Sequence, residues 1–265
     1  MAFPYSEGFL SDRVLLSASP ANMDACVALA EARGLGIELM TFAYPDVLDG
    51  NWRAIVRAYR SLLSSISLRT MHGPFLDMSP GSPDQRVNAL VMDRYRQALD
   101  IGAELAISTV VFHANHITSL RTEVYRDGWT KRNIAFFAAL APYAAERGIT
   151  VAIENMWEYE PAIIVDVLRG VDHPAIRACL DVGHAHLFGE TPFSEWLTCA
   201  GPWLAHTHLN NNDGIVDEHR ALDNGVIAYT AVLTQLRALP EPPTMTLEMD
   251  HVDDMVASLH HFHVQ

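Results

Sequence analysis

Short apolar runs rich in β-branched residues alternate with longer segments of helical period along the whole chain. This alternation is typical of βα units that build a parallel sheet. Since no linker or low-complexity stretch interrupts it, we predict one domain over residues 1–265, an α/β protein folded as a single (β/α)8 TIM barrel. The eight strands are expected near residues 13–17, 36–41, 68–72, 107–113, 150–154, 178–181, 204–209 and 244–248.

Two of the helical segments carry clear signals. The first is expected to have Ser19 as its N-cap, Pro20 at its first position and Gly34 as its stop. A doubly wound sheet is the rival fold, but it normally has a Gly-rich turn after the first strand, and residues 17–20 contain no glycine. Another helix is expected over residues 83–99, with an apolar stripe made of Val87, Leu90, Val91, Tyr95, Ala98 and Leu99.

Ionisable side chains stand at the ends of six consecutive predicted strands, and those ends share one rim in a parallel barrel. They are His72, His113, Glu154, Asp181 (with His184 three residues on), His208 and Glu248. The residues two positions upstream are mostly small or apolar, as the barrel interior requires: Thr70, Val111, Ala152, Cys179, His206 and Thr246. The ionisable side chains are therefore predicted to point inward at the barrel mouth.

Burying so many charged groups together costs many kcal/mol unless cations neutralise them, so the pattern predicts a metal site. Mixed imidazole and carboxylate ligands suit zinc, manganese or cobalt better than calcium. After the seventh strand, Asp217 and His219 form an Asp-x-His pair. Such a pair is often a solvated turn, but beside the strand-end ligands we expect it to bind a cation.

Composition narrows the classes of function. A net charge of −14 argues against general binding of nucleic acid or anionic membranes. No apolar run reaches the roughly 18 residues of a membrane span, and a single lysine, Lys131, disfavours Schiff-base chemistry. Three cysteines without C-x-x-C spacing, and an N-terminus that carries Glu7 and Asp12 instead of a signal sequence, predict a cytoplasmic protein.

The strand-end motifs resemble those of the xylose-isomerase-like TIM barrel superfamily, and the resemblance spans almost the whole chain. This superfamily includes sugar phosphate isomerases and epimerases and apurinic endonucleases of the endonuclease-IV type. The motifs that carry the resemblance are residues 71–75 (Met-His-Gly-Pro-Phe), 110–113, 152–155, 179–184 (Cys-Leu-Asp-Val-Gly-His), 206–209, 217–219 and 246–248. These motifs are specific for the superfamily and much less specific for one reaction.

The isomerase branch implies that Glu154, Asp181, His208 and Glu248 hold one divalent cation, Mn, Zn, Co or Mg. The resemblance further implies that Glu154 and Glu248 form an acid/base pair that moves a proton through a metal-stabilised enediolate, while His184 contacts the substrate. The substrate is then a small sugar or a related hydroxy-carbonyl compound.

Two further residues are candidates for contacting that substrate. Glu160 resembles a substrate-contacting glutamate of the isomerase branch, although a surface residue is the competing interpretation. Trp157 belongs to a set of aromatic residues near the rim that can form an apolar wall for a sugar ring, or alternatively pack under the loops.

The endonuclease branch implies a second hypothesis, a zinc-dependent phosphodiester hydrolase with three ions. All nine of its ligands have counterparts, namely His72, His113, Glu154, Asp181, His184, His208, Asp217, His219 and Glu248. The acidic charge counts against it, as does Asp223-Asn224-Gly225 where the branch has Gly-Glu-Gly. A metal-bearing barrel that binds a ligand or a partner without turnover is the third hypothesis. Barrels of this kind often pair as homo-oligomers, but no stripe in the sequence marks an interface.

Overall fold

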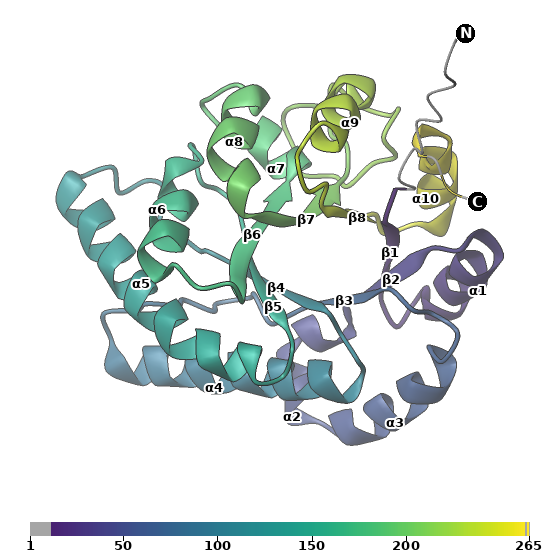
Figure 1. Cartoon of the computed structure of the whole chain (residues 1–265), viewed down its shortest axis with the longest axis horizontal. Coiled ribbons are helices and arrows are strands. Elements are labelled where there is room, and N and C mark those ends of the chain that lie inside the picture. The colour runs from purple at the N-terminus through teal and green to yellow at the C-terminus, as the bar shows by residue number, and fades with distance from the viewer. Residues whose placement is uncertain (1–11, 263, 265) are drawn as a thin grey trace, which may run out of the picture.

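The computed structural model describes residues 12–262 and 264, in which eight parallel strands close into a barrel in chain order (Figure 1). The predicted (β/α)8 barrel is confirmed. Glu7, used above for the N-terminal segment, lies outside the described residues. The strands are β1 (Val14–Ala18), β2 (Gly36–Leu39), β3 (Arg69–His72), β4 (Thr109–His113), β5 (Thr150–Glu154), β6 (Ile176–Asp181), β7 (Leu204–Leu209) and β8 (Thr244–Leu247).

Helices surround the barrel and cover the outer faces of its strands (Figure 1). They are α1 (Met23–Arg33), α2 (Pro45–Asp49), α3 (Trp52–Leu62), α4 (Gln85–Glu104), α5 (Glu123–Ala145), α6 (Ala162–Val171), α7 (Val182–Leu187), α8 (Phe193–Ala200), α9 (Tyr229–Arg237) and α10 (Val252–Ser258). Three short 3-10 helices are η1 (Thr41–Ala43), η2 (Gly201–Trp203) and η3 (Leu259–His261). In the part of the chain that the structure describes, no helix combines the length and the apolarity that crossing a bilayer requires.

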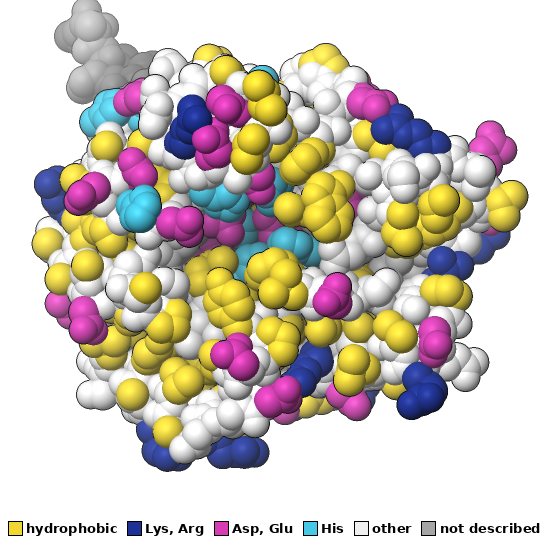
Figure 2. Space-filling view, turned by 180° about the vertical axis from the view of Figure 1, so that it is seen from behind, with side chains coloured by type: hydrophobic (Ala, Val, Ile, Leu, Met, Phe, Trp, Pro, Cys, Tyr) yellow, Lys and Arg dark blue, Asp and Glu magenta, His cyan; other side chains and the backbone are white. Residues whose placement is uncertain are grey.

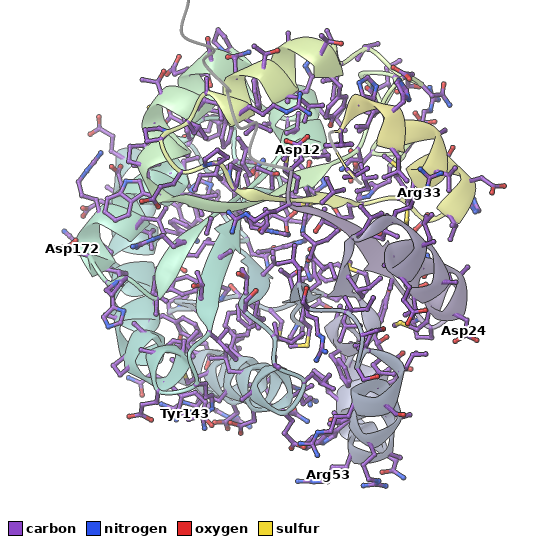
Figure 3. All side chains as sticks on the ribbon, turned by 45° about the vertical axis from the view of Figure 1, so that its right-hand side comes forward. Asp12, Asp24, Arg33, Arg53, Tyr143 and Asp172 are labelled. Atoms are coloured by element: carbon purple, nitrogen blue, oxygen red, sulfur yellow. The ribbon has the colours of Figure 1, made fainter. Side chains whose placement is uncertain are left out.

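The outer faces of the helices are polar, whereas the space between helices and strands holds the main apolar core. Charged residues such as Asp24, Arg33, Arg53 and Asp172 are exposed on the outer ring (Figure 3). A second, smaller apolar cluster lies inside the barrel, where Val111, Ala152 and Cys179 pack together. Those three residues stand two positions before predicted strand-end ligands, so the predicted alternation along β4, β5 and β6 is confirmed.

Strand register explains why the strand ends meet. His113 of β4 is directly paired with Glu154 of β5, and Asp181 of β6 is directly paired with His208 of β7. In-register neighbours on parallel strands project from the same side of the sheet at the same height. The barrel therefore places these four side chains side by side at its mouth.

The predicted start of the first helix was wrong. The Asn22 side-chain oxygen accepts the Ser19 backbone N–H at 2.8 Å, which closes a turn that contains Pro20, and α1 begins only at Met23. Gly34 ends α1 as predicted, because it takes the left-handed conformation at φ 64° that glycine adopts without steric cost.

The predicted stripe on the helix over residues 83–99 was partly wrong. This helix, α4, begins at Gln85 after the N-cap Asp84, whose carboxylate accepts the Arg86 N–H at 2.8 Å. Val87 and Leu90 in its first turns are 37% and 55% exposed, so they lie outside the core. The buried part of the stripe consists of Val91, Tyr95, Ala98 and Leu99.

Candidate metal centre

A cavity of about 230 Å³ opens at the end of the barrel where the strands finish (Figure 2). Histidine and carboxylate side chains gather in its depth, and hydrophobic side chains surround the opening. Seven of the nine predicted ligands line it, namely His72, His113, Glu154, His184, Asp217, His219 and Glu248. The other two, Asp181 and His208, are fully buried and contact this lining from beneath.

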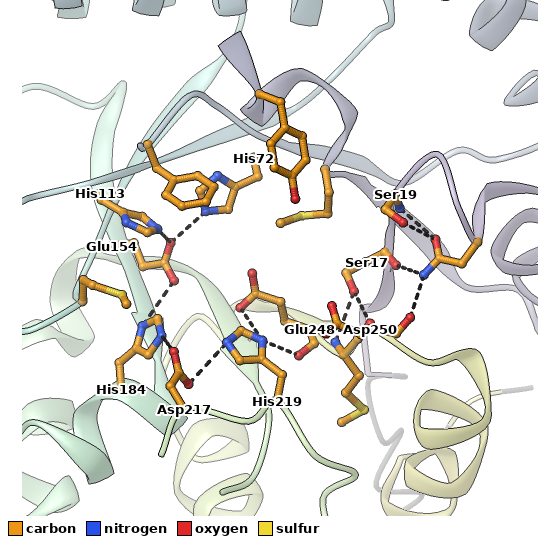
Figure 4. A pocket seen from close by; sticks show the side chains of 16 residues that line it. Ser17, Ser19, His72, His113, Glu154, His184, Asp217, His219, Glu248 and Asp250 are labelled. Atoms are coloured by element: carbon orange, nitrogen blue, oxygen red, sulfur yellow. Dashed lines mark hydrogen bonds and ion pairs between the residues drawn. The ribbon is translucent and has the colours of Figure 1, made fainter. Parts of the chain in front are cut away.

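Glu154, at the end of β5, brings together imidazoles from three other strands, two of which, His72 and His113, are seen in Figure 4. Its Oε2 lies 3.2 Å from Nε2 of His72 and 3.2 Å from Nε2 of His113. Its Oε1 lies 2.8 Å from Nδ1 of His208. Because the Glu154 side chain is only 1% exposed, its charge is balanced by these imidazoles or by a cation and hardly at all by water.

Glu248 follows β8 and approaches the same imidazole from another side. Its Oε2 lies 3.2 Å from Nδ1 of His208, the nitrogen that also contacts Glu154. Asp181, at the end of β6, accepts the His184 backbone N–H at 2.6 Å through Oδ1 and the Asn210 amide at 2.9 Å through Oδ2. These two hydrogen bonds fix the orientation of the Asp181 carboxylate beneath the cavity lining.

The predicted Asp-x-His pair joins the centre from the long loop after β7. Asp217 Oδ2 lies 3.0 Å from Nε2 of His184, and its Oδ1 lies 3.3 Å from Nε2 of His219. His219 has a positive φ of 48°, a costly conformation for a residue with a Cβ. Its ring Nδ1 lies 2.9 Å from the Glu248 carbonyl oxygen, to which it donates a hydrogen bond that helps to hold this conformation.

The charges of the centre shift the pKa values of its members strongly. Burial lowers the pKa of His184, but Asp181 and Asp217 more than offset this and raise it to about 10. Burial raises the pKa of Asp181 to about 6. Burial also raises the pKa of Glu248, yet the charges of His208 and His219 bring it down to about 2. Protons and a cation would therefore compete for the same donor atoms.

The donor set fits a divalent transition metal. Two groups each bring three ligand atoms within 4.8 Å of one another, His72 with His113 and Glu154, and His184 with Asp217 and His219. Glu248 Oε2 and Asp217 Oδ1 are buried oxygens without a hydrogen-bond partner among the described residues, and a cation would satisfy both. Nitrogen and carboxylate donors in such numbers suit zinc, manganese or cobalt.

Sequence reasoning missed Glu38, which is fully buried in β2 and lies within 3.1 Å of both His206 and His208. The signal was present, because Glu38 is the one charged residue of an otherwise apolar strand. It also missed the polar side of the cavity opposite Glu154, formed by Ser17, Ser19, Asn22 and Asp250 (Figure 4).

The two remaining predicted substrate contacts lie away from the cavity lining. The Glu160 carboxylate forms an ion pair with Arg126 of α5, and the Trp157 side chain is 47% exposed. Glu158, two residues before Glu160, is buried instead, and it accepts backbone N–H groups of His116 at 3.1 Å and Met156 at 2.7 Å.

Comparisons with known proteins place this geometry in context. A family profile described as a xylose isomerase-like TIM barrel matches residues 27–262. The uncharacterized protein MJ1311 of Methanocaldococcus jannaschii is 27% identical over 195 residues, which cover 71% of this chain and 66% of that protein. This chain therefore spans just under two thirds of the length of that curated relative.

Solved structures share the whole barrel. The TTHB071 protein of Thermus thermophilus, from a ZnCl2 soak, superposes with a TM-score of 0.79 at 28% identity and covers 94% of this chain and 95% of its own. A D-tagatose 3-epimerase-like protein superposes with a TM-score of 0.78 at 22% identity, with 94% of each chain covered. At that identity, the second likeness establishes a common fold.

Proposed function

The chain belongs to the xylose isomerase-like TIM barrel family, and on that premise we propose that it is a divalent-metal-dependent isomerase or epimerase of a small sugar or a related hydroxy-carbonyl compound. One observation carries this proposal. The carboxylates of Glu154 and Glu248 lie 2.8 Å and 3.2 Å from the same nitrogen of His208, at the floor of a cavity. Two carboxylates beside one ligand position suit proton transfer next to a cation.

The proposed reaction uses four candidate cation ligands, two of which are the glutamates that would transfer the proton. Glu154, Asp181, His208 and Glu248 would hold a divalent cation, which would supply Lewis acidity beside the carbonyl oxygen of the substrate. Glu154 and Glu248 come from β5 and the end of β8, which are not adjacent in the barrel, so they reach a bound substrate from different directions. One glutamate, ionised, removes the proton from the carbon beside the carbonyl, and the other, in its protonated form, returns a proton to the resulting enediolate, so that the two exchange protonation states.

The remainder of the cavity suits an uncharged polyol. Tyr44, Phe75 and Met156 form apolar walls that exclude water, and Ser17 and Asn22 offer hydrogen-bonding groups on the far side. No lysine or arginine is among the described residues that line this cavity. A phosphate group would therefore find no bidentate arginine and no lysine here, which favours a small neutral molecule. His184 lines the same cavity and is the proposed substrate contact.

The proposal is tested with a panel of ketoses and aldoses, assayed with added manganese, cobalt, magnesium or zinc. We expect Glu248→Gln to lower kcat by about 10²–10⁴-fold, the usual contribution of general acid/base groups. Glu158→Gln is the matched control, since Glu158 is also buried but contacts none of the proposed ligands through a hydrogen bond. Turnover by Glu248→Gln at the wild-type rate would refute the mechanism.

A zinc-dependent phosphodiester hydrolase of the apurinic endonuclease type is the second candidate function. It is favoured by the two separate three-ligand groups, which suit more than one zinc ion. The nearby basic residues oppose it, because acidic partners neutralise them. Arg121 is paired with Glu190 at 2.7 Å and Lys131 with Asp127 at 2.7 Å. Lys131 lies in α5, as does the Arg126 that is paired with Glu160.

Two measurements separate these candidates. Protein purified without chelator or added metal should hold about one manganese, cobalt or magnesium ion per chain for the isomerase, and two or three zinc ions for the hydrolase. A duplex with an abasic site, incubated in zinc at several salt concentrations, should stay uncut. Cleavage that is lost on chelation would replace the isomerase proposal with the hydrolase.

We also propose a cytoplasmic location and a single domain over the full 265 residues. The three cysteines, Cys26, Cys179 and Cys199, are all free thiols in the structure, as a reducing compartment favours. Burial raises the pKa of the Cys26 thiol to about 11, so it stays protonated and unreactive.

A further inference from the structure

Glu38 lies inside the barrel, directly beneath the proposed cation site. It belongs to β2, and its side chain is fully buried between strands β3, β7 and β8. Four side-chain donors converge on it. They are Thr70 Oγ1 at 3.0 Å, Thr246 Oγ1 at 2.5 Å, His206 Nε2 at 2.7 Å and His208 Nε2 at 3.1 Å. Such a saturated carboxylate is rigidly held, because moving it leaves several buried donors unpaired.

The two oxygens of Glu38 have different partners. Oε2 takes the hydroxyls of Thr70 and Thr246 and the ring of His206, while Oε1 contacts His208. His206 is itself anchored on its other side, where Nδ1 lies 2.5 Å from Thr244 Oγ1. The whole assembly therefore leaves Oε1 pointing at one atom, the Nε2 of His208.

An ionised carboxylate accepts hydrogen bonds and donates none, so it places the proton of a neutral imidazole on the nitrogen that faces it. For His208 that nitrogen is Nε2. The lone pair then resides on Nδ1, which faces Glu154 Oε1 at 2.8 Å and Glu248 Oε2 at 3.2 Å. A lone pair aimed at two carboxylates is unfavourable by itself and favourable when a cation lies between them.

We infer that Glu38 is a positioning residue that fixes the ring and tautomer of His208 so that Nδ1, and not Nε2, binds the cation. This inference rests on the cation site of the proposed function. Glu38 does not bind the cation itself, because its oxygens are occupied by the four donors and it is not among the described residues that line the cavity.

The test compares zinc affinity of the wild type, Glu38→Gln and Glu158→Gln by competition with a chromophoric chelator. Glutamine keeps the shape but replaces one acceptor oxygen with an N–H donor, so it disrupts the arrangement around His206 and His208. We expect the zinc Kd of Glu38→Gln to rise about 10–100-fold, the usual effect of losing a partner of a metal-binding histidine. Glu158→Gln removes an equally buried carboxylate and should stay within about threefold of wild type.

A second measurement does not depend on the folding of any variant. Nitrogen-15 NMR of histidine-labelled wild-type protein, loaded with zinc, distinguishes a metal-bound nitrogen from a protonated one. We expect His208 to show a protonated Nε2 and a zinc-bound Nδ1. A zinc-bound Nε2 would overturn the inference.

The two proposals fail in different ways. Wild-type protein that binds neither zinc nor manganese would overturn the proposed function and this inference with it. Wild-type protein that binds zinc with the same affinity as folded Glu38→Gln would overturn the role of Glu38 alone.

Discussion

Gly183 occupies a position in α7 where even one methyl group disturbs the metal centre. A Cβ built there would lie 2.0 Å from Oδ1 and 2.9 Å from Cγ of the Asn210 side chain, too close for either atom. Asn210 donates the hydrogen bond that orients Oδ2 of Asp181. Gly183→Ala therefore forces Asn210 to move and leaves a buried carboxylate oxygen without its donor.

The size of the effect follows from three contributions. Overpacking a dense interior costs about 1–3 kcal/mol. Losing a hydrogen bond to a buried charged group costs about 1.5–3 kcal/mol, and alanine returns up to about 1 kcal/mol of helix propensity. We expect a net loss of about 1.5–5 kcal/mol in the free energy of unfolding, and a zinc Kd raised about 10–100-fold because Asp181 is no longer oriented.

Urea unfolding and chelator competition measure these two quantities. Gly128→Ala in α5 is the matched control, because the nearest atom to its added Cβ is the flexible end of Arg132, 3.0 Å away. The control should keep the wild-type zinc affinity and gain up to about 1 kcal/mol of stability. If Gly183→Ala matched Gly128→Ala in both measurements, the reasoning from Asn210 to Asp181 would be refuted.

Three further predictions concern the cation, the pH response and a substrate contact. Zinc at 100 times its Kd should add about 2.7 kcal/mol to the free energy of unfolding, and a chelator should abolish the gain; identical melting curves with and without zinc would contradict a folded-state site. Burial and the charge of Arg126 lower the pKa of His116 to about 4. Since the unfolded chain takes up this proton near pH 6.5 and the folded chain does not, stability is full above pH 6.5 and falls by up to about 3 kcal/mol toward pH 4. His116→Phe should remove this loss when the free energy of unfolding is measured by urea at each pH with chelator present. An unchanged dependence on pH would contradict the assignment to His116. Glu160→Ala should leave KM within about threefold, because its carboxylate is paired with Arg126 outside the cavity lining; a tenfold rise would instead support the predicted substrate contact.

The local sequence was enough to predict which strand-end side chains meet at the rim of the barrel. His113 and Glu154 each end a strand after an apolar residue two positions upstream, and in a barrel with this register such positions are neighbours. Parallel strands in sequential order make this inference sound, because each strand end reaches the same rim regardless of the loops.

Other features needed contacts between distant parts of the chain. Glu38 lies inside the barrel, where it contacts His206 and His208, which are about 170 residues away in sequence. The start of α1 was decided by a side-chain contact between Asn22 and Ser19, which competes with the capping pattern that Ser19 and Pro20 suggest.

The sequence by itself determined the barrel, the rim and the chemical type of its ligands, because alternation along a strand and the order of strands are local properties. Only the tertiary structure decided which candidate ligands lie together, that Glu160 faces Arg126, and that Glu38 contacts His208. These depend on side-chain directions across the barrel and on loops such as the one that carries Asp217 and His219. Such geometry is fixed by packing between residues far apart in the chain, and periodicity carries no information about it.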